Sequence, residues 1–174
     1  MIYILGVNDH RYQAINPKIN PYEHEFHDYV LKHVQAKKIT HLAEEMNDES
    51  LQRENDAQES VCGRLARALA ITHSMCDPNT LEREQIGYIN KRWEDFVRED
   101  ETGCDEKINA EYTAFHKNQW RLREEFWFRK LEAHLSKNVL FVCGAKHVDR
   151  FSGLLKREGI RNRVIQKRWK PSVQ

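Results

Sequence analysis

Short, nearly continuous apolar runs recur along the chain and indicate β-strands. The first, Ile2 to Val7, has the character of a strand buried on both faces of a parallel sheet. Ile39 to Ala43 and Asn138 to Cys143 have the same character, and Ile71 to Met75 and Arg163 to Gln166 are shorter versions of it. We therefore predict five strands, with the first in the interior of the sheet.

The stretches between these runs carry apolar residues every three or four positions, which is the period of an amphipathic helix. The predicted helices cover Tyr22 to Ala36, Glu49 to Ala70, Lys107 to Leu135 and Val148 to Arg157. A further helix is predicted after Asp77-Pro78, along an apolar stripe from Leu81 to Phe96. An acidic, glycine-containing break from Glu99 to Asp105 ends this stripe and predicts a loop or hairpin between helices.

The alternation of strands and helices favours parallel strand pairing, because each pair of strands is joined by a crossover helix. The 174 residues suit one domain with its own core. We therefore predict a single layered α/β domain over residues 1–174, with a mostly parallel central sheet flanked by helices and with long helices in the middle of the chain.

The charge is close to balanced, with 28 Lys and Arg against 27 Asp and Glu. This balance argues against a cationic surface built to bind nucleic acid, although it does not rule out a local basic patch. The segment from Lys156 to Lys170 is such a patch, which we interpret as a solvated helix followed by an edge strand. No apolar run is long enough to cross a membrane, so we expect a cytoplasmic protein; the sequence leaves its oligomeric state open.

The four cysteines, at positions 62, 76, 104 and 143, show no paired metal-binding spacing. We expect them to be reduced thiols. Cys76 lies near His73 in the sequence and is a weaker candidate for a nucleophile, because such a role requires a thiolate beside an imidazole.

Candidate catalytic residues follow three of the predicted strands. His10 lies in the turn after the first strand, Glu44-Glu45 follows the strand that starts at Ile39, and His147 lies in the turn that begins at Gly144. Open α/β sheets place their active sites at the carboxyl ends of the strands. We therefore expect these residues to act together.

Histidine and glutamate support two kinds of chemistry, metal binding and acid–base catalysis. As metal ligands, His10, Glu45 and His147 would hold a divalent metal ion. In a hydrolytic site, Glu44 or Glu45 would be the general base that activates water, and the two histidines would hold the metal or the developing oxyanion. The spacing of these residues does not decide between the two.

The order of these motifs resembles that of a broad superfamily of TIKI, TraB, ChaN and erythromycin-esterase-like proteins. The resemblance rests on a glycine-containing turn with His10, the acidic pair Glu44-Glu45, the Gly144-x-x-His147 motif and Arg123-Glu124 before the last motif. It implies a compact α/β hydrolase-like site, which is metal-dependent and proteolytic in some members and ester-cleaving in others. The first motif departs from the pattern, because three residues separate Gly6 from His10 where the pattern has two.

Arg123, Glu124, Asp77 and Gly144 are the candidate substrate-binding residues. The Arg123 guanidinium is suited to an anionic group on a small-molecule or peptide substrate, with Glu124 or Asp77 orienting it. Gly144 permits a sharp exit from the strand that precedes it. An ordinary ion-pair network of Arg123 and Glu124 on the helix surface is the alternative interpretation.

Two functions remain open from the sequence. The first is a small hydrolase, with or without a metal, that cleaves an ester, amide or phosphoryl bond and brings His10, a carboxylate of the acidic pair and His147 into one pocket. The second is a noncatalytic ligand-binding or protein-interaction module on the same fold. In that module these side chains would diverge or be satisfied by structural contacts.

Overall fold

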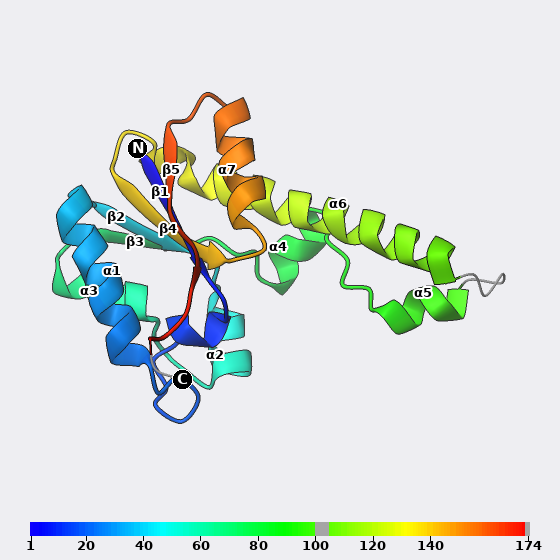
Figure 1. The fold of residues 1–174 in the computed structure, drawn as a ribbon, viewed down its shortest axis with the longest axis horizontal. Coiled ribbons are helices and arrows are strands. Elements are labelled where there is room, and N and C mark those ends of the chain that lie inside the picture. The colour runs from blue at the N-terminus through cyan, green and yellow to red at the C-terminus, as the bar shows by residue number, and fades with distance from the viewer. Residues whose placement is uncertain (100–104, 173–174) are drawn as a thin grey trace.

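Five parallel strands form the centre of the computed structural model, which describes residues 1–99 and 105–172 (Figure 1). The strands are β1 (Ile2–Val7), β2 (His41–Glu44), β3 (Thr72–Met75), β4 (Val139–Gly144) and β5 (Asn162–Trp169). Their order in the sheet is β3-β2-β4-β1-β5, and every pairing is parallel. The predicted α/β fold is confirmed, and β1 lies inside the sheet as predicted.

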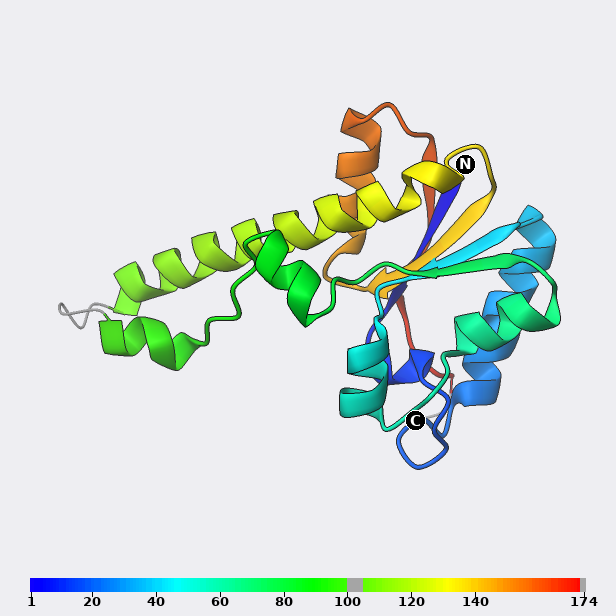
Figure 2. The same cartoon turned by 180° about the vertical axis from the view of Figure 1, so that it is seen from behind.

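Helices cover both faces of this sheet. They are α1 (Glu23–Lys37), α2 (Asp48–Asn55), α3 (Val61–Ala68), α4 (Thr80–Gln85), α5 (Trp93–Glu99), α6 (Asp105–Leu131) and α7 (Val148–Arg157), with 3₁₀ turns at His10–Gln13 and Glu132–His134. Helices α1 and α3 lie on one face, whereas α7 and the C-terminal part of α6 lie on the other (Figures 1 and 2).

The two faces carry separate hydrophobic cores because successive strand residues point to opposite sides. Leu42 packs into the core shared with α1 and α3, and its neighbour Ala43 packs into the core beneath α6 and α7. Leu140 and Phe141 on β4 divide in the same way. This alternation decides which residue of the acidic pair, Glu44 or Glu45, reaches the site.

Two predicted helices are each divided in the structure. Asp56 has a left-handed backbone, φ 42°, at the end of α2, and Ser60 starts α3 by accepting a hydrogen bond from the Gly63 N–H. The stripe from Leu81 to Phe96 is divided into α4 and α5, with Gly87 at φ 69° just after α4. The predicted loop after α5 falls mostly on residues 100–104, which lie outside the described residues.

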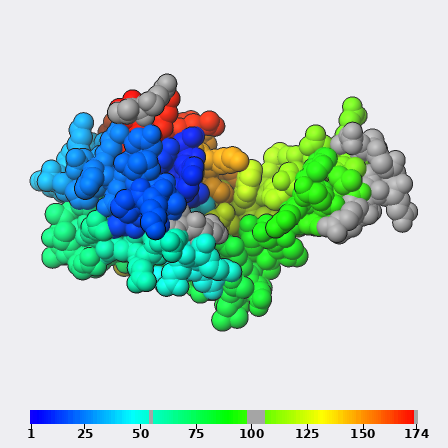
Figure 3. Space-filling model, turned by 90° about the horizontal axis from the view of Figure 1, so that it is seen from below, coloured from blue at the N-terminus to red at the C-terminus, as the bar shows by residue number. Residues whose placement is uncertain are grey.

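Helix α6 confirms the long helix predicted in the middle of the chain. Its 27 residues extend well beyond the sheet, and α5 packs along the projecting part (Figures 1 and 2). Phe96 of α5 lies edge-on to Tyr112 and Phe115 of α6, with ring centroids 5.5 and 5.4 Å apart. The space-filling view shows these helices as an arm that stands away from the rest of the molecule (Figure 3).

The thiols of Cys62, Cys76 and Cys143 are free and buried, whereas Cys104 lies outside the described residues. None of the helices in the described part of the chain is long and apolar enough to span a bilayer.

His41 gives the fold a specific sensitivity to acid. It is buried on β2, its Nδ1 lies 2.7 Å from the Thr72 hydroxyl, and its ring stacks on His134 at 3.7 Å. Burial, with the nearby charges of His134 and Lys137, lowers the pKa of His41 from 6.5 to about 3. The folded protein therefore keeps this ring neutral at a pH where the unfolded chain protonates it.

We expect the stabilisation from neutral His41 to be complete above pH 6.5 and to be lost as the pH falls toward 3. Between pH 7 and pH 5 the loss should be about 1–2 kcal/mol, and His41→Asn should remove most of that pH dependence. Urea denaturation at the two pH values measures it. His24→Asn, at an exposed histidine of α1, is the control; equal pH dependence in both variants would contradict this account.

Candidate functional site

Residues that follow four strands meet at one edge of the sheet. His10 follows β1, Glu45 follows β2, Asp77 follows β3, and Gly144 and His147 close the turn after β4. Because all strands are parallel, their carboxyl ends lie at the same edge. Glu45 is held there by its backbone N–H, which donates to the Val142 carbonyl on β4 at 2.7 Å.

These residues surround a cleft with two lobes that share His10, Glu45 and Arg123. One lobe, of about 220 Å³, is also lined by Met46, Ser50, Asp77 and Arg83, and we call it the Arg83 lobe. The other, of about 300 Å³, is also lined by Val7, Asn8, Gly144, Ala145, Lys146, His147 and Arg168, and we call it the Lys146 lobe.

Arg123 of α6 bridges two carboxylates at the centre of the cleft. Its Nη2 lies 2.7 Å from Glu45 Oε1 and 2.6 Å from Asp77 Oδ1, and its Nε donates to the same Asp77 oxygen at 2.8 Å. Glu45 Oε2 accepts a hydrogen bond from the Gly144 N–H at 2.7 Å. The guanidinium is therefore held by the protein itself, and its two nearest anions are Glu45 and Asp77.

The ion pair with Arg123 keeps Glu45 ionised although Glu45 is buried. Burial alone would raise the pKa of Glu45, but Arg123, then His10 and His147, and the Gly144 N–H outweigh it and hold the pKa below the usual 4.5. The Arg123 pKa is raised in turn: burial opposes its charge, but Glu45 and Asp77 favour it more strongly. A carboxylate held in this way accepts a proton only with difficulty.

Asp77 is saturated with donors. Besides Arg123, it accepts hydrogen bonds from Trp127 Nε1 at 3.1 Å and from Arg83 Nη2 at 2.9 Å. The guanidinium carbon of Arg123 lies 5.4 Å from the Trp127 ring centroid, one helical turn along α6. Asp77 thus anchors α6 to the end of β3, and Asn79 forms the cap of α4.

His147 and Glu124 form a buried dyad. His147 Nδ1 lies 2.8 Å from Glu124 Oε1, and Arg150 Nε donates to both Glu124 oxygens, at 3.1 and 3.3 Å. Since a carboxylate paired with arginine acts as an acceptor, Nδ1 carries the hydrogen and Nε2 is left to face the cleft. The rings of Trp127 and Trp120 lie edge-on to the imidazole, at 4.9 and 5.7 Å, and fix its orientation.

His10 is the accessible histidine of the cleft, with 45% of its side chain exposed against 7% for His147. The Gln13 amide nitrogen lies 2.9 Å from His10 Nδ1. With that amide nitrogen as donor, Nδ1 accepts and Nε2 carries the hydrogen. A Cβ added at Gly144 would lie 2.8 Å from His10 Nε2, so a larger residue there would displace this ring.

The two imidazoles converge on one oxygen. His10 Nε2 lies 3.8 Å and His147 Nε2 lies 3.6 Å from Glu45 Oε1. Both distances are longer than that of a hydrogen bond, so neither Nε2 is hydrogen-bonded to Glu45. Both are therefore available to a third group that enters the cleft.

Glu44 points to the opposite face of the sheet. It is fully buried, accepts a short hydrogen bond from the Ser60 hydroxyl and lies 2.8 Å from His73 Nε2. Alternation along β2 places it on the same side as Leu42, facing α3, and it lines neither lobe of the cleft. Of the acidic pair, only Glu45 reaches the site.

Cys76 is not placed to act as a nucleophile. The side chain is buried, and burial together with nearby Glu44 raises the pKa of the thiol to about 12. A thiol at that pKa supplies almost no thiolate at neutral pH.

The cleft residues do not fit a divalent metal ion. His10, Glu45 and His147 offer suitable atoms, but the Arg123 guanidinium already lies 2.7 Å from the Glu45 oxygen that both histidines face. Its fixed positive charge opposes a second cation there. Across residues 1–99 and 105–172, no three or more His, Cys, Asp or Glu side chains are grouped so as to hold a metal.

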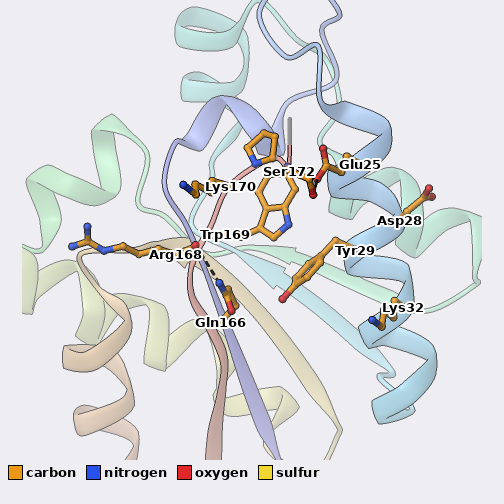
Figure 4. A pocket seen from close by; sticks show the side chains of 10 residues that line it. Glu25, Asp28, Tyr29, Lys32, Gln166, Arg168, Trp169, Lys170 and Ser172 are labelled. Carbon is orange, nitrogen blue, oxygen red and sulfur yellow. Dashed lines mark hydrogen bonds between the residues drawn. The ribbon is translucent and has the colours of Figure 1, made fainter. Parts of the chain in front are cut away.

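A larger hollow lies elsewhere, between α1 and the end of β5 (Figure 4). It measures about 660 Å³ and is lined by side chains such as Tyr29, Lys32 and Trp169. Trp169 is only 4% exposed because Phe26 and Tyr12 pack against it, so its ring is part of the core. The described residues that line this hollow include no histidine, and so no pair comparable with the Glu124–His147 dyad.

Several residues that hold the cleft side chains in place have no distinctive signal in the sequence. Trp127 lies in an aromatic stripe that predicts only core packing, and Gln13 and Arg150 are isolated polar residues. Their spacing is informative in retrospect: Gln13 and Arg150 each lie three residues after a cleft histidine, at helical positions close to it.

Comparison with known proteins finds no family model, curated protein or solved structure that matches this chain.

Proposed function

We propose that this protein is a hydrolase that uses acid–base catalysis without a metal ion, with His147 as the general base. The observation that carries the proposal is the Glu124–His147 dyad, whose Nε2 faces a cleft beside a second imidazole, that of His10. We propose further that the chain is a distant relative of the TIKI, TraB, ChaN and erythromycin-esterase-like proteins, whose order of motifs it resembles.

His147 suits the role of base better than Glu45 does. Glu124 holds Nδ1–H and stabilises the positive charge that forms when Nε2 takes a proton, which is the role of the carboxylate in serine hydrolases. The pKa of Glu45 is lowered, and each of its oxygens already accepts a hydrogen bond. We assign to Glu45 the positioning of Arg123.

Water is the nucleophile in this proposal. The described cleft offers one hydroxyl side chain, Ser50, and its Oγ donates within the turn to the Asn47 side chain at 2.8 Å. A water molecule in the Lys146 lobe would lose a proton to His147 Nε2 while its oxygen forms the new bond to the carbonyl carbon or phosphorus of the substrate.

His10 completes the reaction. Its Nε2–H is directed into the cleft and would donate a hydrogen bond to the oxyanion that develops on the substrate. When the bond to the leaving group breaks, protonated His147 returns its proton to the leaving oxygen or nitrogen. The cycle consumes one water and one ester, amide or phosphoryl bond and restores both imidazoles.

The test is hydrolysis of chromogenic ester, amide and phosphoester panels by the wild type and by the double variant His10→Gln, His147→Gln. We expect the wild type to hydrolyse at least one class and the double variant to lose that activity. The double variant His24→Gln, His27→Gln, on α1 outside the cleft, is the matched control and should retain it. No hydrolysis of any class by the wild type would instead favour a noncatalytic ligand-binding module.

A further inference from the structure

We propose that the Lys146 lobe binds an anionic group of the substrate, a phosphate or a carboxylate, through Lys146 and Arg168. This inference deepens the proposed function and rests on it for the word substrate. Anion binding itself requires no turnover, so the two can fail separately.

The lobe carries positive charge that the protein does not neutralise. Among the described residues neither Lys146 nor Arg168 has an acidic side chain within ion-pair distance, and both are exposed at the edge of the lobe. Glu45 is the one carboxylate that lines the lobe, and Arg123 already pairs with it. Two cations therefore face this cavity without an anion.

Neighbouring basic residues do have partners. Lys167, next to Arg168 on β5, pairs with Asp149, and Arg150 of α7 pairs with Glu124. Arg168 lines both the cleft and the neighbouring hollow, and its side chain extends away from Tyr29 and Lys32 of that hollow (Figure 4). Among the described basic residues near this end of β5, Arg168 is thus the one without an acidic partner that also lines the cleft.

The position of these cations suits a substrate rather than a stray ion. Lys146 directly precedes the proposed base His147 in the turn after β4, and both residues line the same lobe, so an anionic group bound there would share the cavity with the reacting atoms. Helix α7 begins at the same turn without a side-chain cap, which adds positive potential. An arginine and a lysine together match the oxygens of phosphate or carboxylate.

The sequence leaves open whether Arg123 binds an anionic substrate group or forms an ion-pair network. In the structure its Nε and Nη2 atoms contact Glu45 and Asp77, and its side chain is only 15% exposed. These two carboxylates neutralise its charge, whereas Lys146 and Arg168 have no acidic partner among the described residues. We therefore assign anion recognition to Lys146 and Arg168.

Calorimetric titration of the full chain with inorganic phosphate, and separately with acetate, at low ionic strength tests the proposal. We expect the double variant Lys146→Gln, Arg168→Gln to bind the preferred anion at least about fivefold more weakly than the wild type. The matched control Arg163→Gln, Lys170→Gln makes the same change in charge outside the cleft and should bind like the wild type. Tighter phosphate binding would assign a phosphate, and tighter acetate binding a carboxylate.

The proposal is overturned if the wild type binds neither anion, or if the cleft and control variants bind equally well. The variant His147→Gln separates it from the proposed function. This variant should keep anion binding while losing hydrolysis, because it removes the base and leaves both cations. Anion binding that depends on Lys146 and Arg168 in a protein that hydrolyses nothing would support this inference and contradict the hydrolase.

Discussion

Replacing His147 with glutamine is expected to lower kcat by about 10²–10⁴-fold, the usual contribution of a positioned general base. Glu124→Gln should also lower kcat, because a neutral amide cannot stabilise the imidazolium that forms when His147 takes a proton. Since Glu124 acts through His147, adding Glu124→Gln to the His147 variant should cost little more. Steady-state kinetics of the two single variants and the double variant measure this coupling.

Circular dichroism of the same variants distinguishes catalysis from folding. His147→Gln should keep the helical spectrum of the wild type, because the amide can still contact Glu124. Additive losses in kcat from the two positions would contradict the dyad. A shift in the lower limb of the pH–rate profile in Glu124→Gln would support it, because a purely structural contact would leave that profile in place.

Replacing Arg123 with methionine is expected to destabilise the fold by about 3–5 kcal/mol, because it leaves Glu45 and Asp77 buried without their shared cation. Methionine keeps much of the side-chain volume, so the loss should report charge rather than packing. Urea denaturation gives the free energy of unfolding. Arg121→Met is the control: Arg121 lies on the same helix, is about half exposed and pairs only at the surface with Glu125.

The stability lost in Arg123→Met should depend on pH, because Glu45 is ionised only above its pKa. In the wild type, the folded pKa of Glu45 lies below 4.5, so its stabilisation is complete above that pH and is lost as the pH falls through the folded pKa. The cost of Arg123→Met should therefore be greatest at neutral pH and smaller near pH 4. Adding Glu45→Gln and Asp77→Asn should recover part of the lost stability. A loss within about 1 kcal/mol of the control would contradict a buried bridge.

The fold could be predicted because local signals and tertiary structure agree in this chain. The apolar run Ile2 to Val7 is β1 to the residue, and Val148 to Arg157 is α7. The divided helices could not be predicted, since the polar residues around Asp56 have no glycine or proline to mark the left-handed backbone that ends α2 there. The strand order also has no local signal, because it depends on which crossover passes over which face.

Part of the cleft follows from topology alone. Once the strands are parallel, His10, Glu45 and His147 must lie at one edge of the sheet. The choice between Glu44 and Glu45 depends on which face β2 presents at its last residue, and the boundary of a short strand is not sharp in sequence. The bridge from Arg123 to Glu45 spans 78 positions and depends on the rotation of α6, which no local pattern specifies.

Hydrolysis by metal-stripped protein in the presence of a chelator is the most direct measurement of the central claim. Using the best substrate from the ester, amide and phosphoester panels, we expect the stripped wild type to retain its full rate, because His147 and His10 perform the proton transfers. A rate that vanishes on chelation and returns with added zinc, manganese or magnesium would contradict acid–base catalysis without a metal.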